Sequence, residues 1–295
     1  MKSDKSNLSR LTLVFRALHS RNYRLFFGGQ SISLIGTWLT QIATSWLVYR
    51  LTNSALLLGV VGFASQIPVF LLTPFAGVLV DRWNRHRALV VTQTLSMAQS
   101  FALAILTLTG VINVWHIIAL SAFQGLIDAF DMPARQSFVV EMVEKREDLA
   151  NAIALNSSMV NSARLIGPSI AGVLIATVGE GMCFLIDGIS YIGVIAALMG
   201  MKITPRTIET ETSNVLQRLK EGFSYAFSFA PIRSILLFIG LVSLVGRPYL
   251  VLMPVFAKDV LHGGSHALGF LMGASGMGAL VGSIYLASRK TVRGL

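Results

Sequence analysis

Long apolar runs alternate with short polar segments along the whole chain. Each run is about 18 to 25 residues long, which is the length that an α-helix needs to cross the hydrocarbon core of a bilayer. Lipid offers the backbone no hydrogen-bond partner, so a crossing segment must satisfy its own peptide groups as a helix. The pattern predicts an all-α membrane protein with eight transmembrane helices, at residues 25–49, 55–80, 88–108, 114–131, 155–178, 182–201, 234–256 and 268–287.

The spacing of the apolar runs divides the chain into four parts. The first six runs follow one another closely, and a long polar segment separates them from the last two. Apolar residues also recur at helical spacing at 11–18 and 215–223, which indicates helices on the membrane surface. Solvated charged loops are the alternative for both segments. The parts are a cytoplasmic tail at 1–24, a six-helix bundle at 25–201, a linker at 202–233 and a partial second bundle at 234–295.

Composition and charge exclude several other classes of protein. Only 13% of the residues are charged, 54% are hydrophobic and the mean hydropathy is +0.67, which argues against two soluble domains. The net charge of +10 is not a nucleic-acid footprint, because most of the 24 Lys and Arg residues fall in alternate loops on one side of the predicted helices. Only Arg50 and Lys258 fall in loops on the other side. This bias predicts a bacterial inner-membrane protein with both termini in the cytoplasm, and the single Cys183 excludes an intrachain disulfide.

The loop between the second and third predicted helices carries the most specific motif. Gly77 is followed four residues later by Asp81 and then by three arginines, Arg82, Arg85 and Arg87. A general excess of cytoplasmic charge is the alternative explanation, and it accounts for the arginines but not for the spacing of Gly77 and Asp81. The pattern resembles the signature of the major facilitator superfamily in this loop, although Asn84 stands where that family usually has glycine.

The residues of this motif have separate expected roles. Gly77 would let a neighbouring helix approach closely, and charge pairs and helix dipoles would hold Asp81 at a helix end. The arginines would anchor at lipid phosphates or bridge to acids on the fourth helix, for which Asp128 and Asp131 are available. Such a latch can break and re-form as two helix bundles rock, so the motif predicts a gate.

The fifth predicted helix contains Arg164, Gly167, Pro168 and Gly172. This stretch is similar to the Gly-Pro-rich motif of antiporters and exporters of the same superfamily. Pro168 removes a backbone hydrogen bond, so the helix is expected to bend where the two halves of the fold meet. A kink that serves packing alone is the alternative. Ser121 replaces an arginine that many proton-coupled members carry on the fourth helix, so the resemblance does not by itself imply proton antiport.

Ionisable groups inside a bilayer cost about 2.5–3.5 kcal/mol each on insertion scales and so indicate function. The predicted helices contain three such residues: Arg164, Asp187 and Arg247. The two arginines are candidates for binding an anionic substrate, and Asp187 is a candidate proton carrier or counter-ion. Purely structural pairing is the alternative for each. The first predicted helix adds a stripe of polar residues on one face. This stripe either lines water or bonds to a neighbouring helix, and it consists of Gln30, Ser33, Thr37, Gln41 and Thr44.

Stretches at 22–26, 131–136 and 151–158 narrow the resemblance to one branch of the superfamily. They look like the bacterial exporters that include the enterobactin exporter and the transmembrane secretion effectors. The resemblance implies a secondary transporter rather than an enzyme. Such a transporter exports small amphipathic molecules, such as siderophores, drugs or metabolites, by alternating access. The expected partners are membrane lipids and a small-molecule substrate, with no nucleic acid, metal or cofactor, and Asp187 makes the proton a candidate coupling ion.

The last predicted helix is rich in glycine, with pairs at Gly269 and Gly273 and at Gly278 and Gly282. Small residues four apart predict tight helix packing, whereas a dinucleotide-binding loop would need a preceding strand. The superfamily's fold has two halves of six helices each, and the pattern supplies eight helices. A second hypothesis is therefore a truncated, membrane-inserted product that does not transport, or a membrane interaction protein.

Overall fold

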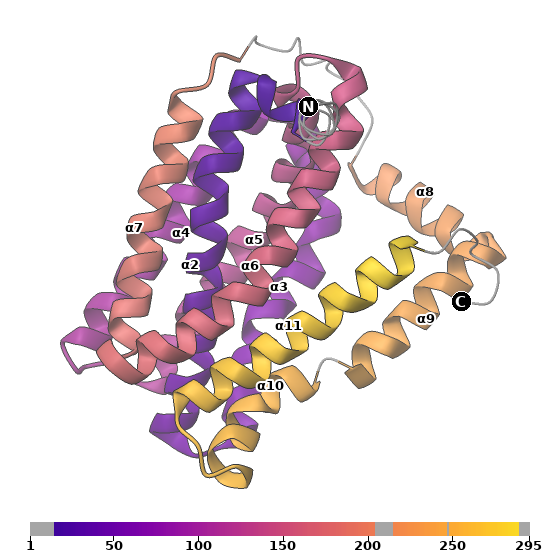
Figure 1. The fold of residues 1–295 in the computed structure, drawn as a ribbon. Helices are drawn as coiled ribbons and strands as arrows, with labels where there is room; N and C mark the ends of the chain where they lie inside the picture. Colours follow the sequence, from indigo (N-terminus) through magenta and orange to yellow (C-terminus); the bar gives the residue numbers. More distant parts are fainter. Residues whose placement is uncertain (1–14, 204–214, 247, 289–295) are drawn as a thin grey trace.

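The computed structural model describes residues 15–203, 215–246 and 248–288. This part of the chain folds into helices joined by short connections and has no strand, which confirms the all-α class (Figure 1). Short turns of 3-10 helix, η1 (Arg16–His19) and η2 (Arg146–Asp148), precede α2 and α6, and a π-helical turn, η3 (Phe256–Val260), follows α10. The helices are α2 (Arg21–Thr52), α3 (Ala55–Arg82), α4 (Arg85–Leu108), α5 (Val114–Met142), α6 (Leu149–Val178), α7 (Glu180–Met199), α8 (Val215–Ser228), α9 (Ala230–Gly246), α10 (Pro248–Val255) and α11 (Ser265–Ser288).

Six segments of the described chain are long and apolar enough to cross a membrane. Five of them correspond to α3, α4, α5, α6 and α7, and the sixth runs from 230 to 260 through α9, α10 and η3. The other two predicted spans also form helices, because α2 has 32 residues and α11 has 24. The six apolar segments confirm the membrane fold. Because α2 and α11 are not among these segments, the count of eight crossings remains a prediction.

The predicted seventh span, 234–256, lies within the sixth of these segments. Helix α9 ends at Gly246 and α10 begins at Pro248, and the one residue between them lies outside the described part of the chain. Pro254 lies near the end of α10, and the π-helical turn η3 follows it.

The helices up to α7 form a bundle in which each helix packs on its neighbours (Figure 1). Helix α2 lies against α6 and α7, α4 lies against α5 and α7, and α3 lies against α5. Their buried apolar side chains form two clusters, one around Phe138 and Leu198 and the other around Leu47 and Phe184. We name the end of the bundle that carries the α3–α4 loop the basic end, and the end that carries the α2–α3 loop the distal end.

Two of the stretches that narrowed the resemblance meet at the basic end. The Tyr23 hydroxyl of α2 donates a hydrogen bond of 2.8 Å to the Ala152 carbonyl of α6. Asn22 donates to the Lys202 carbonyl at 2.8 Å and accepts from the Lys202 N–H at 3.1 Å. These bonds fix the start of α2 against the start of α6 and the end of α7.

Helix α11 packs on α6 through a seam of small residues. A Cβ atom at Gly172 would lie 2.7 Å from Gly269 Cα, so only glycine allows this approach. Gly273 likewise packs against Ser169, which confirms the predicted tight packing for the first glycine pair. Gly278 and Gly282 face no described atom within 4 Å. The second pair therefore does not pack, because α11 leaves the bundle towards the basic end (Figure 1).

Helices α8 and α9 lie beside the bundle rather than inside it (Figure 1). Helix α8 covers the segment 215–223, so the helix predicted there is confirmed. No residue of α9 is buried, although its sequence is strongly apolar. In the N-terminal counterpart, residues 1–14 lie outside the described residues, and Arg16–His19 form η1.

Candidate functional site

A layer of buried polar side chains separates the two apolar clusters of the bundle. In α2 this layer lies between Phe26 and Leu39, and in α4 it lies between Leu89 and Leu103. Polar groups inside a membrane-embedded bundle need hydrogen-bond partners there, because lipid supplies none. The buried members of this polar layer are Gln30, Ser33, Thr92, Gln93, Ser96, Gln99, Ser100, Asp131, Asp187 and Ser190.

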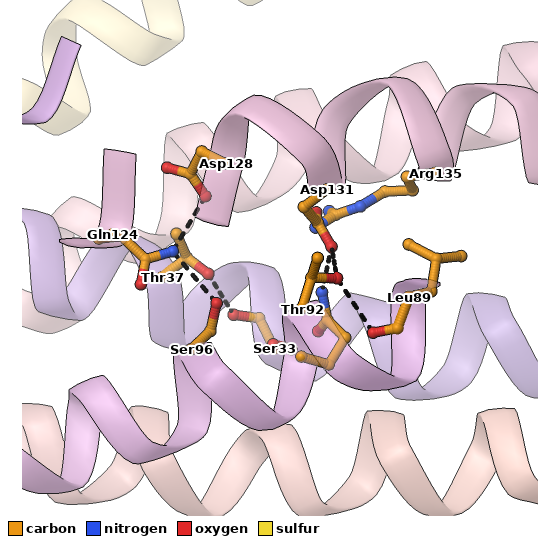
Figure 2. A network of polar contacts seen from close by, with 10 residues as sticks. Ser33, Thr37, Leu89, Thr92, Ser96, Gln124, Asp128, Asp131 and Arg135 are labelled. Atoms are coloured by element: carbon orange, nitrogen blue, oxygen red, sulfur yellow. Dashed lines mark hydrogen bonds and ion pairs between the residues drawn. The ribbon is translucent and has the colours of Figure 1, made fainter. Parts of the chain in front are cut away.

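Asp131 of α5 organises the part of the polar layer nearest the basic end (Figure 2). Its carboxylate accepts hydrogen bonds from Thr92 Oγ1 at 2.8 Å and from Gln93 Nε2 at 2.8 Å, both on α4. Arg135, one turn further along α5, forms an ion pair with the same carboxylate. Asp131 is only 3% exposed, so the cation and the two donors replace the water that its carboxylate loses on burial.

Gln124 connects the middle of the polar layer to the second carboxylate of α5. Its Nε2 donates to Asp128 Oδ1 at 2.9 Å and to Ser96 Oγ at 3.2 Å (Figure 2). Its Oε1 is buried and has no hydrogen-bond partner among the described residues. One residue further on, Gly125 lets α5 approach α3, since a Cβ there would overlap the Ser65 carbonyl.

The latch expected between the α3–α4 loop and α5 takes a different form. Asp128 and Asp131 have the partners given above, and within the described chain neither carboxylate bonds to an arginine of the loop. Arg85 Nη1 instead lies 2.7 Å from Glu141 Oε1. Glu141 lies about 15 Å beyond Asp131 along α5, at 1.5 Å per residue, and so is closer to the basic end. In this conformation, the acid that pairs with Arg85 is therefore one that the sequence did not single out.

Three other residues of the loop motif have specific outcomes. Asn84 caps α4, because its side chain accepts the Arg87 N–H at 3.0 Å, which accounts for the departure from glycine. Gly77 faces no described atom within 4 Å, so the close helix approach expected there is absent in this conformation. The side chain of Asp81 lies outside what the structure describes. Trp83 of the loop stacks on Phe130 of α5 with ring centroids 5.9 Å apart.

Asp187 of α7 is the innermost carboxylate of the polar layer and is 1% exposed. Its Oδ2 accepts hydrogen bonds from Thr40 Oγ1 of α2 at 2.7 Å and from Ser100 Oγ of α4 at 2.8 Å. Its Oδ1 has no hydrogen-bond partner among the described residues. Gly36 makes room for this carboxylate, since a Cβ there would lie 2.5 Å from Oδ1. Asp187 therefore lies inside the six-helix bundle, held by hydroxyl groups.

Arg164 is not a counter-ion of Asp187 in the described part of the chain. Arg164 of α6 is half-buried, and in the described part of the chain its guanidinium forms no hydrogen bond or ion pair. Its backbone lies in the seam, because a Cβ at Gly276 of α11 would lie 3.1 Å from the Arg164 carbonyl oxygen. Arg247 lies outside the described residues.

The polar stripe of α2 divides between two environments. Gln30 and Ser33 are buried in the polar layer, Thr44 is half-buried, and Thr37 and Gln41 are exposed. Thr37 Oγ1 donates to the Ser33 carbonyl at 3.0 Å, one turn back along α2 (Figure 2). The stripe therefore combines the two interpretations that the sequence left open, burial against other helices and an accessible polar face.

At the distal end, a group of polar contacts joins α2 to η3. The Tyr49 hydroxyl donates to the Asp259 carboxylate, and Lys258 Nζ donates to Asn53 Oδ1 at 2.5 Å. The Lys258 ammonium also lies 5.4 Å from the centroid of the Tyr49 ring. We name these four residues the distal clasp. Sequence reasoning missed it, and the only signal was the isolated pair of charges at 258–259 in an otherwise apolar region.

Helix α6, with the Gly-Pro motif, is where the bundle contacts α11. A Cβ at Gly167 would overlap Trp38 of α2, and Gly172 meets Gly269 of α11. Pro168 is buried inside α6, which remains continuous from Leu149 to Val178. The motif therefore lies at the junction of the bundle with the later helices, where the sequence placed it. No group of three His, Cys, Asp or Glu side chains that could hold a metal occurs among the described residues.

Comparison with known proteins identifies the family. The family model described as transmembrane secretion effector, of the major facilitator superfamily, matches residues 13–293. The chain belongs to this family. As a transmembrane secretion effector it is a multi-pass bacterial membrane protein, and its relatives are transporters rather than enzymes.

Three relatives illustrate the family. The chain is 27% identical over 264 residues to the staphyloferrin A transporter of Staphylococcus aureus, covering 89% of this chain and 66% of the relative. It is 27% identical over 264 residues to the multidrug efflux pump Tap of Mycolicibacterium fortuitum, with coverages of 84% and 62%. It is 22% identical over 271 residues to macrolide efflux protein A of Streptococcus pyogenes, with coverages of 90% and 67%. The chain spans about two thirds of the length of these relatives.

Proposed function

We propose that this protein is a secondary transporter of the bacterial inner membrane that exports small amphipathic molecules by alternating access, with both termini in the cytoplasm. The names of its relatives, a siderophore transporter and drug efflux proteins, support an exporter. In alternating access, one helix bundle rocks against another around a binding site near the middle of the membrane. Rocking needs contacts between the halves that form at one end of the molecule and open at the other.

The observation that carries the proposal is the asymmetry between the two ends of the molecule. The distal clasp and the Gly172–Gly269 contact hold the later helices against the bundle at the distal end. Towards the basic end, Gly278 and Gly282 face no described atom within 4 Å. In the proposed cycle, the basic end lies in the cytoplasm, and substrate enters from this end while the distal end is closed.

Arg164 is the proposed anchor for an anionic group of the substrate. It lies on α6 at the seam with α11, and its guanidinium has no bonded partner within the described chain. A guanidinium offers five donors in a planar fork that matches a carboxylate, so a substrate carboxylate would complete its hydrogen bonds. Arg247 is the second proposed anchor, from its position in the sequence. Thr37 and Gln41, which are exposed, supply the proposed polar wall from α2.

Asp187 is the proposed carrier of a coupling proton. Two hydroxyl groups and an apolar bundle surround it, and no cation neutralises it in the described structure. Burying an unpaired carboxylate is costly, whereas the neutral acid can be buried with ordinary hydrogen bonds. A proton bound at Asp187 would therefore favour the packed state of α2, α4 and α7. Release of this proton would favour a rearranged state, which couples proton movement to rocking.

A flux assay on this chain in proteoliposomes tests the proposal. The purified protein would be reconstituted with a proton gradient imposed across the membrane, and uptake of radiolabelled erythromycin and staphyloferrin A would be measured separately. Gradient-dependent uptake of either compound above that of empty liposomes supports an exporter. Uptake equal to that of empty liposomes for both would contradict it and favour the alternative of a membrane-inserted product that does not transport.

A further inference from the structure

Helix α4 buries a continuous polar face inside the bundle. Between Leu89 and Leu103, its buried residues are all polar and follow one another at spacings of one, three or four, so they lie on one face. A transmembrane helix turns apolar side chains to lipid, and the polar side chains that it buries need partners on neighbouring helices or in internal water. The residues of this α4 stripe are Thr92, Gln93, Ser96, Gln99 and Ser100.

Each end of the α4 stripe bonds to a buried carboxylate. At one end, Thr92 and Gln93 donate to Asp131, which is paired with Arg135. At the other end, Ser100 donates to Asp187 at 2.8 Å. The eight steps from Thr92 to Ser100 rise about 12 Å along the helix axis, at 1.5 Å per residue. The stripe therefore connects the ion pair near the basic end to the carboxylate in the middle of the bundle.

Several buried acceptors along the α4 stripe have no hydrogen-bond partner among the described residues. They are Gln93 Oε1, Gln124 Oε1, Ser33 Oγ and Asp187 Oδ1, which come from all four helices around the stripe. Buried polar atoms are nearly always bonded to protein or to internal water, and a water site needs two to four polar partners. The polar atoms of the α4 stripe and its neighbours provide the partners that internal water molecules need, along the whole stripe.

The charged and titratable groups around Asp187 are few. Helices α2 and α4 present only hydroxyl groups and Gly36 to it. On α7 itself, the titratable side chain one turn from Asp187 is Tyr191, which is also buried. The other charged side chains near the stripe are Asp128, Asp131 and Arg135 of α5.

We infer that the α4 stripe is an internal proton path between Asp187 and the Asp131–Arg135 pair, running inside the six-helix bundle and apart from the α6–α11 seam. When the proton moves from Asp187 towards the basic end, the Asp187 carboxyl gives it to an adjacent water and becomes a carboxylate. That water passes a proton to the next hydroxyl or water, and the excess proton leaves at the basic end. The inference rests on the proposed role of Asp187 as a proton carrier and adds the route by which the proton reaches it.

The α4 stripe separates proton movement from substrate movement. The proposed substrate anchor Arg164 lies on α6 at the seam, whereas Asp187 is enclosed by α2, α4 and α7. Variants of the stripe should therefore alter the rate at which Asp187 gains and loses its proton, without altering substrate contacts. Thr92 and Ser96 are positioning residues in this path, because they would bond to water and to carboxylates rather than to the substrate.

Time-resolved infrared spectroscopy of the purified full chain after a pH jump tests the inference without any substrate. The C=O band of the protonated Asp187 carboxyl is identified by its loss in Asp187→Asn. Thr92→Val and Ser96→Ala are each expected to slow the appearance of this band by about tenfold, an added barrier of the size that one lost transfer group produces. Thr94→Val is the matched control, since Thr94 is an exposed residue of the same helix that bonds only to the Val90 carbonyl.

The possible results of this experiment test the proton path independently of the exporter function. Slowing in Thr92→Val or Ser96→Ala, with Thr94→Val like the wild type, supports the path. An Asp187 band that appears at the wild-type rate in both stripe variants overturns the path, and the proteoliposome flux result is unaffected. If no band is lost in Asp187→Asn at any pH, Asp187 does not exchange a proton, and both the path and its role as carrier are overturned. The exporter assignment is then decided by the flux assay alone.

Discussion

Tyr49 of α2 donates a hydrogen bond to Asp259 of η3, and this bond ties the first helix of the bundle to the segment that follows α10. Lys258 reinforces the contact from the neighbouring position, through Asn53 and the face of the Tyr49 ring. All of these residues lie at the distal end, whereas α9 buries no residue at all. The distal clasp is therefore the part of the molecule whose opening would convert one state of the proposed transport cycle into the other.

Tyr49→Phe should weaken the distal clasp while keeping the ring beneath Lys258. A hydrogen bond to a charged group contributes about 1.5–3 kcal/mol, so its loss should raise the population of molecules with an open distal end. Electron–electron double resonance between spin labels at the exposed positions 56 and 261 measures this population. Tyr225→Phe is the matched control, because Tyr225 is an exposed residue of α8. Identical distance distributions for Tyr49→Phe and the wild type would rule out a gating role for this bond.

Gly172→Ala should disrupt the seam between α6 and α11. The new methyl group would lie 2.7 Å from Gly269 Cα, and overpacking of this kind typically costs about 1–3 kcal/mol. Gly278→Ala on α11 is the control, since its Cβ meets no described atom within 4 Å. Alanine is a better helix former than glycine by about 1 kcal/mol, so the control should be neutral or more stable. Thermal unfolding in detergent compares them, and equal melting temperatures for the two variants would contradict the seam.

Arg85 and Glu141 should show a favourable coupling at the basic end. Their side chains are 13% and 21% exposed, and their charged atoms lie 2.7 Å apart. A double-mutant cycle with Arg85→Gln and Glu141→Gln should give a coupling energy of about 0.5–3 kcal/mol, the range for residues in direct contact. The free energy of unfolding in mixed detergent micelles provides the measurement. Additive single effects would show that the pair does not stabilise this conformation.

Arg164→Gln should weaken the binding of substrates with an anionic group. The substitution keeps hydrogen-bonding capacity but removes the charge and the forked geometry, so the KM for staphyloferrin A uptake should rise by about tenfold, as for 1.4 kcal/mol of lost binding. The exposed Arg233 of α9 offers the control Arg233→Gln. Arg164→Lys should retain part of the affinity, because it preserves the charge alone. A KM unchanged in Arg164→Gln would remove this residue from the substrate site.

The sequence predicted the helices well, because hydrophobic length is a local property of each segment. The all-α class, the helix at 215–223 and the packing of Gly269 and Gly273 all follow from such local patterns.

The partners of each charged residue could not be predicted in the same way. Pairing between helices depends on their relative height and rotation in the bundle, which hydropathy does not contain. Arg85 therefore meets Glu141 rather than the acids expected, and Tyr49 meets a residue 210 positions away. The Asp131–Arg135 pair is an exception that its spacing of four could have indicated.

In the proposed function, this chain moves amphipathic solutes at the expense of a proton gradient through Asp187. The most direct measurement compares gradient-driven uptake of erythromycin and staphyloferrin A by the wild type, Asp187→Asn and Glu144→Gln in proteoliposomes, where Glu144 is an exposed loop residue. We expect uptake by the wild type and Glu144→Gln, and loss of the gradient-driven part in Asp187→Asn. Gradient-driven uptake by Asp187→Asn at the wild-type rate would contradict proton coupling through this residue.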